Sequence, residues 1–414
     1  MSNLVEDIFL LDDALQFSYN RYKEDYIKVS PVTGTSLNNP GSIRFEVNNQ
    51  QNYICLSDSF LVCEFSITKG DGTPLGNDDI TLEHNFFPRC FNGMSLTIGG
   101  REVENIAQAV GEASTITNFI MTSDVYKRTY GIISGNCPDT GKGDNDVDNA
   151  ANDANQGYYM RRKVYNDKKK FTLMFPLKSV FGFMDYKKIL YLIKINLSLI
   201  KKDDAVISPD IFYGAAATTG KIIFHKLEWW IPSIQPSLEI EEMIMKRLNT
   251  KVPIDITFKK NTSGTNTIPT GSTNAWKLGN VSNAVRFIFL AFKPTAAPSF
   301  QTNNALFTDH VGADRITSIR IQMNNNYYPI DRMEFDFANH NIVEPYNSYV
   351  ECCKTFGVEP QLSYQEYHDL YPIFVIDVSA QDERLKTNGI DITVHIEKSS
   401  GLTLQGFYLM KEDC

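Results

Sequence analysis

The hydrophobic pattern along the first half of the chain is mostly that of strands. From residue 42, apolar and polar residues alternate in short runs that end in Gly, Asn or Asp, as in "SIRFEVNN", "SFLVCEFSITKGDG" and "MSLTIGG". Alternation over about four to eight residues is typical of a strand with one buried face. The first half is therefore predicted to be a β domain.

One helical pattern interrupts these strands. Apolar residues from Val103 to Ile120 recur at roughly helical spacing across residues 101–123. This spacing predicts a helix over those residues, inserted between two strands of the domain.

The second half repeats this order of elements with little residue identity. Residues 251–260 alternate like the first strand, residues 284–300 match the long second strand, residues 316–330 mirror the third, and residues 340–356 take the place of the helix. A tandem duplication explains the order. Many short strands with a helix in each half fit a jelly roll. The predicted fold is all-β, with two tandem eight-stranded jelly rolls and short helices in the crossovers.

The stretch "HKLEWWIPSIQPSLEIEE" (residues 225–242) lies between the two halves. Proline fixes its own φ and lacks an N–H, so Pro232 and Pro236 are predicted to end the preceding strand and to carry an extended connector. The residues that follow, 237–248, are predicted to form a short helix with Ser237 as its N-cap.

These observations divide the chain into four parts. Its 414 residues exceed what a single core usually fills. We expect an N-terminal arm (1–40), a first jelly roll (41–233), a linker with a short helix (234–248) and a second jelly roll (249–414). The arm has leucine and isoleucine at helical spacing between residues 4 and 15, which is typical of an amphipathic helix.

Two pairs of adjacent aromatic residues are candidate contact residues. Side chains of successive strand residues point to opposite faces. One member of the pair Trp229 and Trp230, and one of the pair Tyr327 and Tyr328, is therefore expected in the core and the other at an interface or the surface.

Charge limits the classes of partner. Forty basic and forty-nine acidic residues give a net charge of −9, which argues against a surface that neutralises nucleic acid throughout. A local contact with an anionic partner remains open at residues 161–170, where a solvated loop and a nuclear-import signal are the alternatives. The basic residues of this candidate patch are Arg161, Arg162, Lys163, Lys168, Lys169 and Lys170.

Catalytic and metal-binding motifs are absent from the sequence. The seven cysteines include no CxxC and the six histidines no HxH or HExxH, so we expect free thiols in a reducing compartment and no cofactor or metal. Residues 135–143 lack the Ser or Thr of a phosphate loop. The acidic N-terminus and the absence of a long apolar run predict neither a signal peptide nor a membrane span.

The ordered features of residues 43–106 resemble a known family. They include an alternating strand, Asp58-Ser59 at the entry of the second strand, a turn at Asp71-Gly72 and a turn at Gly99-Gly100. This order resembles the opening of the double jelly-roll major capsid proteins of Polinton-like and adintovirus-like elements, virophages and their large-DNA-virus relatives.

Residues 226–237 are similar to the end of the first roll in that family, where a strand leads through prolines into the second roll. The resemblance implies that Trp229, Trp230, Pro232 and Pro236 form the inter-roll linker and help to pack the rolls together.

The resemblance also implies a function. A non-enzymatic major capsid protein would form a homotrimeric, pseudo-hexagonal capsomer that tiles an icosahedral shell around a DNA genome. Its partners would be further copies of itself, minor capsid and penton proteins, the packaged DNA through weak contacts, and a host receptor through surface loops. It would reside in the virion and assemble in the host cytoplasm or nucleus. Its N-terminal arm (residues 1–40) would lie on the inner face of the shell and tether neighbours or minor proteins.

Two other functions compete with this hypothesis. A glycan-binding or receptor-attachment β-sandwich protein could use Tyr327 or Tyr328 as a sugar platform. A double-jelly-roll hydrolase would need only carboxylates from distant positions, whereas a copper monooxygenase would need paired histidine ligands that the sequence lacks.

Overall fold

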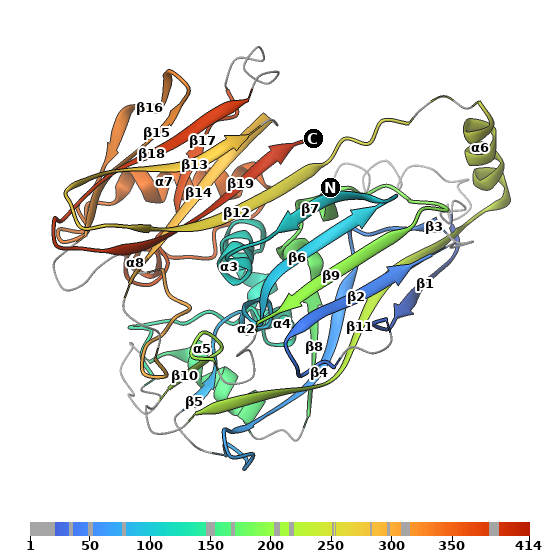
Figure 1. The fold of residues 1–414 in the computed structure, drawn as a ribbon, viewed down its shortest axis with the longest axis horizontal. Helices are drawn as coiled ribbons and strands as arrows, with labels where there is room; N and C mark the ends of the chain where they lie inside the picture. Colours follow the sequence, from blue (N-terminus) through green and yellow to red (C-terminus); the bar gives the residue numbers. More distant parts are fainter. Residues whose placement is uncertain are drawn as a thin grey trace, which may run out of the picture.

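Two β domains lie side by side in the computed structural model of the chain (Figure 1). The first roll, drawn blue to yellow-green, and the second, drawn yellow to red, meet along α3. The structure describes residues 21–32, 36–48, 53–76, 80–145, 154–166, 170–202, 208–214, 219–250, 252, 254–281, 284–295, 299–307, 315–380 and 389–414.

The first roll consists of two four-stranded antiparallel sheets, in the orders β1-β11-β4-β8 and β2-β9-β6-β7. A short strand β3 (Tyr53–Ile54) also pairs with β11, and β5 (Ile80–Leu82) pairs with β10 (Phe212–Gly214). The strands of the two main sheets are β1 (Arg21–Val29), β2 (Gly41–Val47), β4 (Phe60–Lys69), β6 (Phe91–Ile98), β7 (Arg101–Ile106), β8 (Phe171–Pro176), β9 (Ile195–Lys201) and β11 (Gly220–Pro236).

The second roll has the same arrangement. Its sheets have the orders β12-β19-β14-β17 and β13-β18-β15-β16, so each strand has a counterpart at the same place in the first roll. The strands are β12 (Lys259–Ile268), β13 (Thr273–Val281), β14 (Ala284–Pro294), β15 (Ile316–Met323), β16 (Asn326–Glu334), β17 (Phe374–Asp377), β18 (Ile390–Lys398) and β19 (Leu404–Asp413). The predicted fold of two tandem eight-stranded jelly rolls is confirmed.

Alternation in the sequence produces these sheets because one face of each strand is buried. In β18, Ile390, Ile392, Val394 and Ile396 are buried, whereas the residues between them are partly exposed. Burying each such aliphatic side chain contributes about 1.5–3 kcal/mol. The buried faces of the sheets in each roll form its hydrophobic core.

Short helices occupy the crossovers, as predicted. In both rolls a longer helix follows the hairpin that ends the second sheet: α3 (Val110–Met121) comes after β7, and α7 (Val343–Thr355) comes after β16. The other α-helices are α2 (Phe86–Arg89), α4 (Asp124–Ser134), α5 (Gln156–Arg161), α6 (Leu238–Asn249) and α8 (Tyr364–Asp369). Single turns of 3-10 helix form η3 (Leu177–Ser179) and η4 (Gly182–Asp185), and η2 (Arg162–Asn166) is a π-helical turn.

The helix predicted over residues 101–123 begins too early. Gly99 and Gly100 have φ of 59° and 82°, which closes a tight turn, and the chain then returns as β7 beside β6. The helix starts only at Val110. The prediction was wrong here because the apolar residues of β7 happen to continue the helical spacing of α3.

The strand predicted over residues 251–260 is also misplaced. Among these residues, the described ones before Lys259 are not in a strand, and β12 begins at Lys259. The helix predicted over residues 237–248 is confirmed by α6. Ser237 is its N-cap residue, but the side chain makes no capping hydrogen bond.

The strand before the linker does not end at the prolines. β11 continues through Pro232 to Pro236, and β1 pairs with this segment. A proline lacks an N–H but keeps its carbonyl, and Pro232 O accepts a hydrogen bond from the backbone N–H of Cys55 at 3.1 Å. Residues 21–29 are therefore a sheet strand. The four domain limits stay predictions; β1 lies within the segment predicted as the arm.

Candidate assembly surfaces

The contact between the two rolls is built around β7 and α3. β7 lies against β12, and α3 lies against β19 and α7 of the second roll. α3 is buried along nearly its whole length because the first roll covers its other side. These elements fix the orientation of one roll relative to the other.

A buried carboxylate joins three backbone segments at this contact. Glu104 on β7 accepts hydrogen bonds from the backbone N–H groups of Gly182 at 2.8 Å, Phe183 at 3.0 Å and Asn261 at 2.8 Å. Burial raises the pKa of Glu104 to about 7, although these donors and Lys411 oppose the rise. The carboxylate holds β12 of the second roll to β7 and η4 of the first.

A second polar cluster crosses the contact at the start of α3. Glu112 Oε1 lies 2.6 Å from Arg89 Nη1 and 2.7 Å from Lys293 Nζ. Burial opposes ionisation of Glu112, but Lys293 and Arg89 together hold its pKa well below the ordinary value. One carboxylate thus pairs with a cation from each roll.

Arg161, predicted to belong to a surface patch, lies in the interior instead. Its guanidinium donates to Asp139 Oδ1 at 2.8 Å and to the backbone carbonyls of Leu82 and Cys137. Burial alone would lower the pKa of Arg161, but the Asp139 carboxylate keeps it above its ordinary value. Tyr371 of the second roll donates its hydroxyl to the same aspartate at 3.3 Å. The side chain is structural because a fully buried cation must be paired.

The rest of the basic stretch is only partly at the surface. Lys170 pairs with Glu64 at 2.7 Å, Lys163 is exposed and Arg162 is half-buried. Lys168 and Lys169 lie outside the described residues. The structure therefore reduces the predicted patch, since Arg161 is not available to an anionic partner.

The two tryptophans belong to the first roll rather than to the contact between rolls. Trp229 is fully buried, with its ring 6.4 Å from that of Phe45. Trp230 points to the outer face, where its ring lies 5.8 Å from Phe60 and 4.1 Å from Lys28 Nζ. The expected split into a core and a surface residue is confirmed, because adjacent strand residues face opposite ways.

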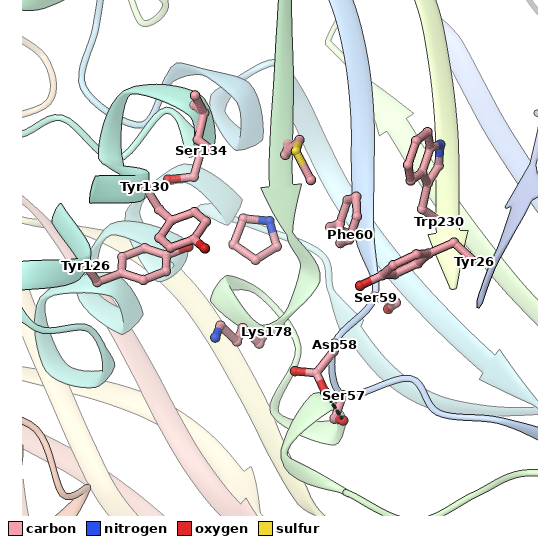
Figure 2. Close-up of a pocket in the computed structure, with 13 residues that line it drawn as sticks. Tyr26, Ser57, Asp58, Ser59, Phe60, Tyr126, Tyr130, Ser134, Lys178 and Trp230 are labelled. Atoms are coloured by element: carbon pink, nitrogen blue, oxygen red, sulfur yellow. Dashed lines mark hydrogen bonds between the residues drawn. The ribbon is translucent and has the colours of Figure 1, made fainter. Parts of the chain in front are cut away.

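A cavity lined by aromatic side chains, the aromatic slot, lies on the outer face of the sheet β1-β11-β4-β8 (Figure 2). It is a cavity of about 390 Å³ between two aromatic walls, with Asp58 and Lys178 near its rim. The walls are Tyr26, Phe60 and Trp230 on the sheet and Tyr126 and Tyr130 on α4.

The rings in each wall of the slot contact one another. Tyr126 and Tyr130 are stacked, with ring centroids 5.5 Å apart and an interplanar angle of 20°. Across the slot, the Tyr26 ring lies 5.3 Å from that of Phe60. Sequence reasoning missed this site because its residues come from β1, β4, β8, β11 and α4, and no local motif joins them.

Two strands at the ends of their sheets expose apolar side chains. On β16, Ile330 is 82% exposed and Tyr327 is 39% exposed; on β1, Tyr26 is 43% exposed. The Arg320 guanidinium lies 3.7 Å above the Tyr327 ring, whereas Tyr328 packs against the core. The predicted split between Tyr327 and Tyr328 is confirmed.

Catalytic features are few in the part of the chain that the structure describes. Those residues include no group of three His, Cys, Asp or Glu side chains that could hold a metal ion. The seven cysteines are free thiols, and Cys352 and Cys353 are buried on α7. No helix in the described ranges has the length and apolar character to cross a membrane.

Comparison with known proteins gives a family and a fold. A family model for the double jelly roll-like domain matches residues 145–405. No curated protein matches the chain.

Several solved viral structures match nearly the whole chain. A chain in the structure of the Sputnik virophage has 12% identity and a TM-score of 0.61, covering 97% of this chain and 88% of that one. The Faustovirus major capsid protein has 10% identity and a TM-score of 0.58, covering 99% and 93%. The mavirus major capsid protein has 9% identity and a TM-score of 0.56, covering 97% and 89%. At these identities the matches establish the fold.

Proposed function

The chain belongs to the double jelly roll-like domain family, and from this we propose that it is a major capsid protein whose copies build an icosahedral shell around a DNA genome. The observation that carries the proposal is the end-to-end match to capsid proteins, which leaves little of either chain unaligned. An enzyme built on a jelly roll would be expected to carry a catalytic site in addition to the sheets of the fold.

The capsomer we propose is a homotrimer. Each chain carries two rolls with the same strand order, so three chains place six similar rolls around one axis. Such a ring closes by a heterologous contact, in which different surfaces of neighbouring copies meet. A pseudo-hexagonal tile of this kind can pack against others to form a shell.

The surface of the single chain supports this assembly. Exposed apolar residues occur on β1, β16 and α6, and the aromatic slot is open to solvent. Clustered apolar surface of this kind marks sites of protein association. The shell location makes the virion the proposed compartment, with minor capsid and penton proteins, DNA and a receptor as further partners.

Solution mass and imaging test the proposal. The full chain would be expressed alone and analysed by size exclusion coupled to light scattering, then by negative-stain electron microscopy. We expect a particle near three times 46.9 kDa with hexagonal outline, or larger shells. A monomer of 46.9 kDa at micromolar concentration would contradict the capsomer and redirect attention to glycan and amide substrates.

A further inference from the structure

Two pairs of end strands occupy equivalent positions in the sheets of the two rolls. β7 of the first roll corresponds to β16 of the second, and β12 of the second corresponds to β1 of the first. Within one chain β7 lies against β12, so this end strand of the first roll already meets an end strand of the second. Their counterparts, β16 and β1, are hydrogen-bonded only on one side within the described part of the chain.

The pair β7 and β12 is more buried than the pair β16 and β1. At the covered contact, Glu104 on β7 is 1% exposed and Asn261 on β12 is fully buried. On the uncovered strands, Ile330 of β16 is 82% exposed and Tyr26 of β1 is 43% exposed. Equivalent strands of the two rolls therefore differ in exposure because one pair has a neighbouring roll and the other does not.

The shape of β16 also suits a contact. Its pairing with β15 is irregular between Ile319 and Ile321, and the extra residues form a bulge that carries Ile330. β7 has a bulge near the corresponding place, next to Glu104, which touches the second roll. In both rolls the irregular pairing thus falls in this strand: in β7 it is next to Glu104, which bonds to the second roll, and in β16 it includes Ile330, which is exposed.

We infer that β16 of one copy docks on β1 of the next copy and repeats, between chains, the contact that β7 makes with β12 within each chain. This inference rests on the proposed capsid function and assigns the surfaces of its trimer. Ile330 and Tyr327 of one copy cover Tyr26 and enter the aromatic slot of the next, where Phe60 and Trp230 line one wall.

The correspondence between the strands of the two rolls also explains why the aromatic slot is open to solvent. In the second roll, β19 is covered by α3 of the first roll. Its counterpart in the first roll is β11, which carries Trp230 on the slot wall. The preceding copy, which contributes β16, supplies the missing cover, because its α7 is the counterpart of α3 and begins with Val343, which is 66% exposed.

The positions of the two strands are compatible with a closed ring. β16 and β1 lie at opposite ends of the molecule (Figure 1). A contact between such different surfaces is heterologous and passes from copy to copy in one direction. In a trimer, three contacts within chains would alternate with three contacts between chains.

Site-specific crosslinking of the full chain tests the pairing. A photo-reactive phenylalanine analogue replaces Ile330, the mass is measured by light scattering, and crosslinked peptides are identified by mass spectrometry. We expect crosslinks between chains to peptides that contain Tyr26 or Trp230. The same analogue at Leu192, which is 59% exposed and on neither edge strand, is the matched control and should give none of these crosslinks.

A substitution gives an independent readout. Ile330→Glu should raise the dissociation constant of the trimer roughly tenfold or more, because a charge enters an apolar contact, whereas Leu192→Glu should leave it unchanged. A wild-type trimer that crosslinks elsewhere, or that is insensitive to Ile330→Glu, would overturn this inference and leave the proposed function standing. A wild-type chain that remains monomeric would overturn the proposed function and this inference with it.

Discussion

Trp229 and Trp230 show how one step along a strand changes the role of a residue. Trp229 is fully buried in the first roll, so Trp229→Ala should lower the free energy of unfolding by about 3–5 kcal/mol. Trp230 lies on the outer face, and Trp230→Ala should cost about 1 kcal/mol or less. Urea unfolding at one fixed protein concentration compares the two variants, because association also contributes to stability.

Trp230 should matter for association instead. Since its ring lines the aromatic slot, Trp230→Ala should weaken the trimer in light scattering while leaving the unfolding midpoint of the monomer almost unchanged. Equal losses of stability for the two tryptophan variants would show that the slot is part of the folding core.

Glu83 is a residue whose charge should make stability depend on pH. It is fully buried and accepts a hydrogen bond from the backbone N–H of Asn304 at 2.8 Å. Burial raises the pKa of Glu83 from 4.5 to about 8; Asp139 adds to the rise, while Arg89 and Arg161 oppose it. The folded chain therefore keeps a proton between these two values that the unfolded chain has released.

The sign of the effect follows from that proton. The contribution of Glu83 to stability is fully present below pH 4.5 and is lost as the pH rises through about 8. Glu83→Gln resembles the neutral acid, so its stability should fall less between those pH values, by an amount on the order of a few kcal/mol. Thermal unfolding at several pH values measures the difference. Parallel curves for the two proteins would mean that Glu83 is ionised in the folded chain.

At the scale of elements, β1 should be needed for the first roll. β1 pairs with β11 from Arg21 to Val29, whereas residues 1–20 lie outside the described part of the chain. Deleting residues 1–20 should leave trimers but impair shells, in keeping with the predicted tethering role. Deleting residues 1–29 should also expose the edge of β11, lower the melting temperature and cause aggregation.

The two deletions are compared by light scattering, thermal unfolding and negative-stain imaging. Normal shells after deletion of residues 1–20 would refute the tethering role. A stable trimer after deletion of residues 1–29 would show that β1 is dispensable for both the roll and the contact with β16.

The strands that the sequence predicted well are those with a strongly apolar buried face. β6 and β15 alternate clearly, whereas β4 and β14 contain continuous buried apolar runs, and the order of these strands in the two halves indicated the duplication. β1 and β13 were missed and β12 was misplaced, because strands at or near a sheet edge carry many polar residues. β12, for example, has the sequence "KKNTSGTNTI", and these residues form a strand because they pair with β19.

The candidate site was less predictable than the fold. Trp230 was identified as a contact residue from its position beside Trp229, but the contact surface it joins was assigned to the wrong place. Tyr126 and Tyr130 reach the slot only because α4 packs on β8, a contact that no local pattern encodes. Arg161 was misassigned because a buried Arg–Asp pair and a surface basic cluster look alike in sequence.

At the scale of the whole molecule, the two rolls should unfold as one unit. Glu112 of the first roll pairs with both Arg89 of its own roll and Lys293 of the second, and the three side chains are largely buried. Glu112→Gln would leave two buried cations without a carboxylate, which should cost about 3–5 kcal/mol, although partial solvent access reduces this. We expect one calorimetric transition for the wild type and two for the variant, because the contact between rolls is weakened first.

A surface ion pair provides the control. Glu351 and Lys354 on α7 are both more than half exposed, so Glu351→Gln should change stability by less than about 1 kcal/mol and keep one transition. If Glu112→Gln also kept a single transition at the wild-type temperature, the apolar packing of α3 and the Glu104 hydrogen bonds would suffice to couple the rolls. The buried charges would then serve mainly to fix the orientation in which the second roll presents β16 to the next copy.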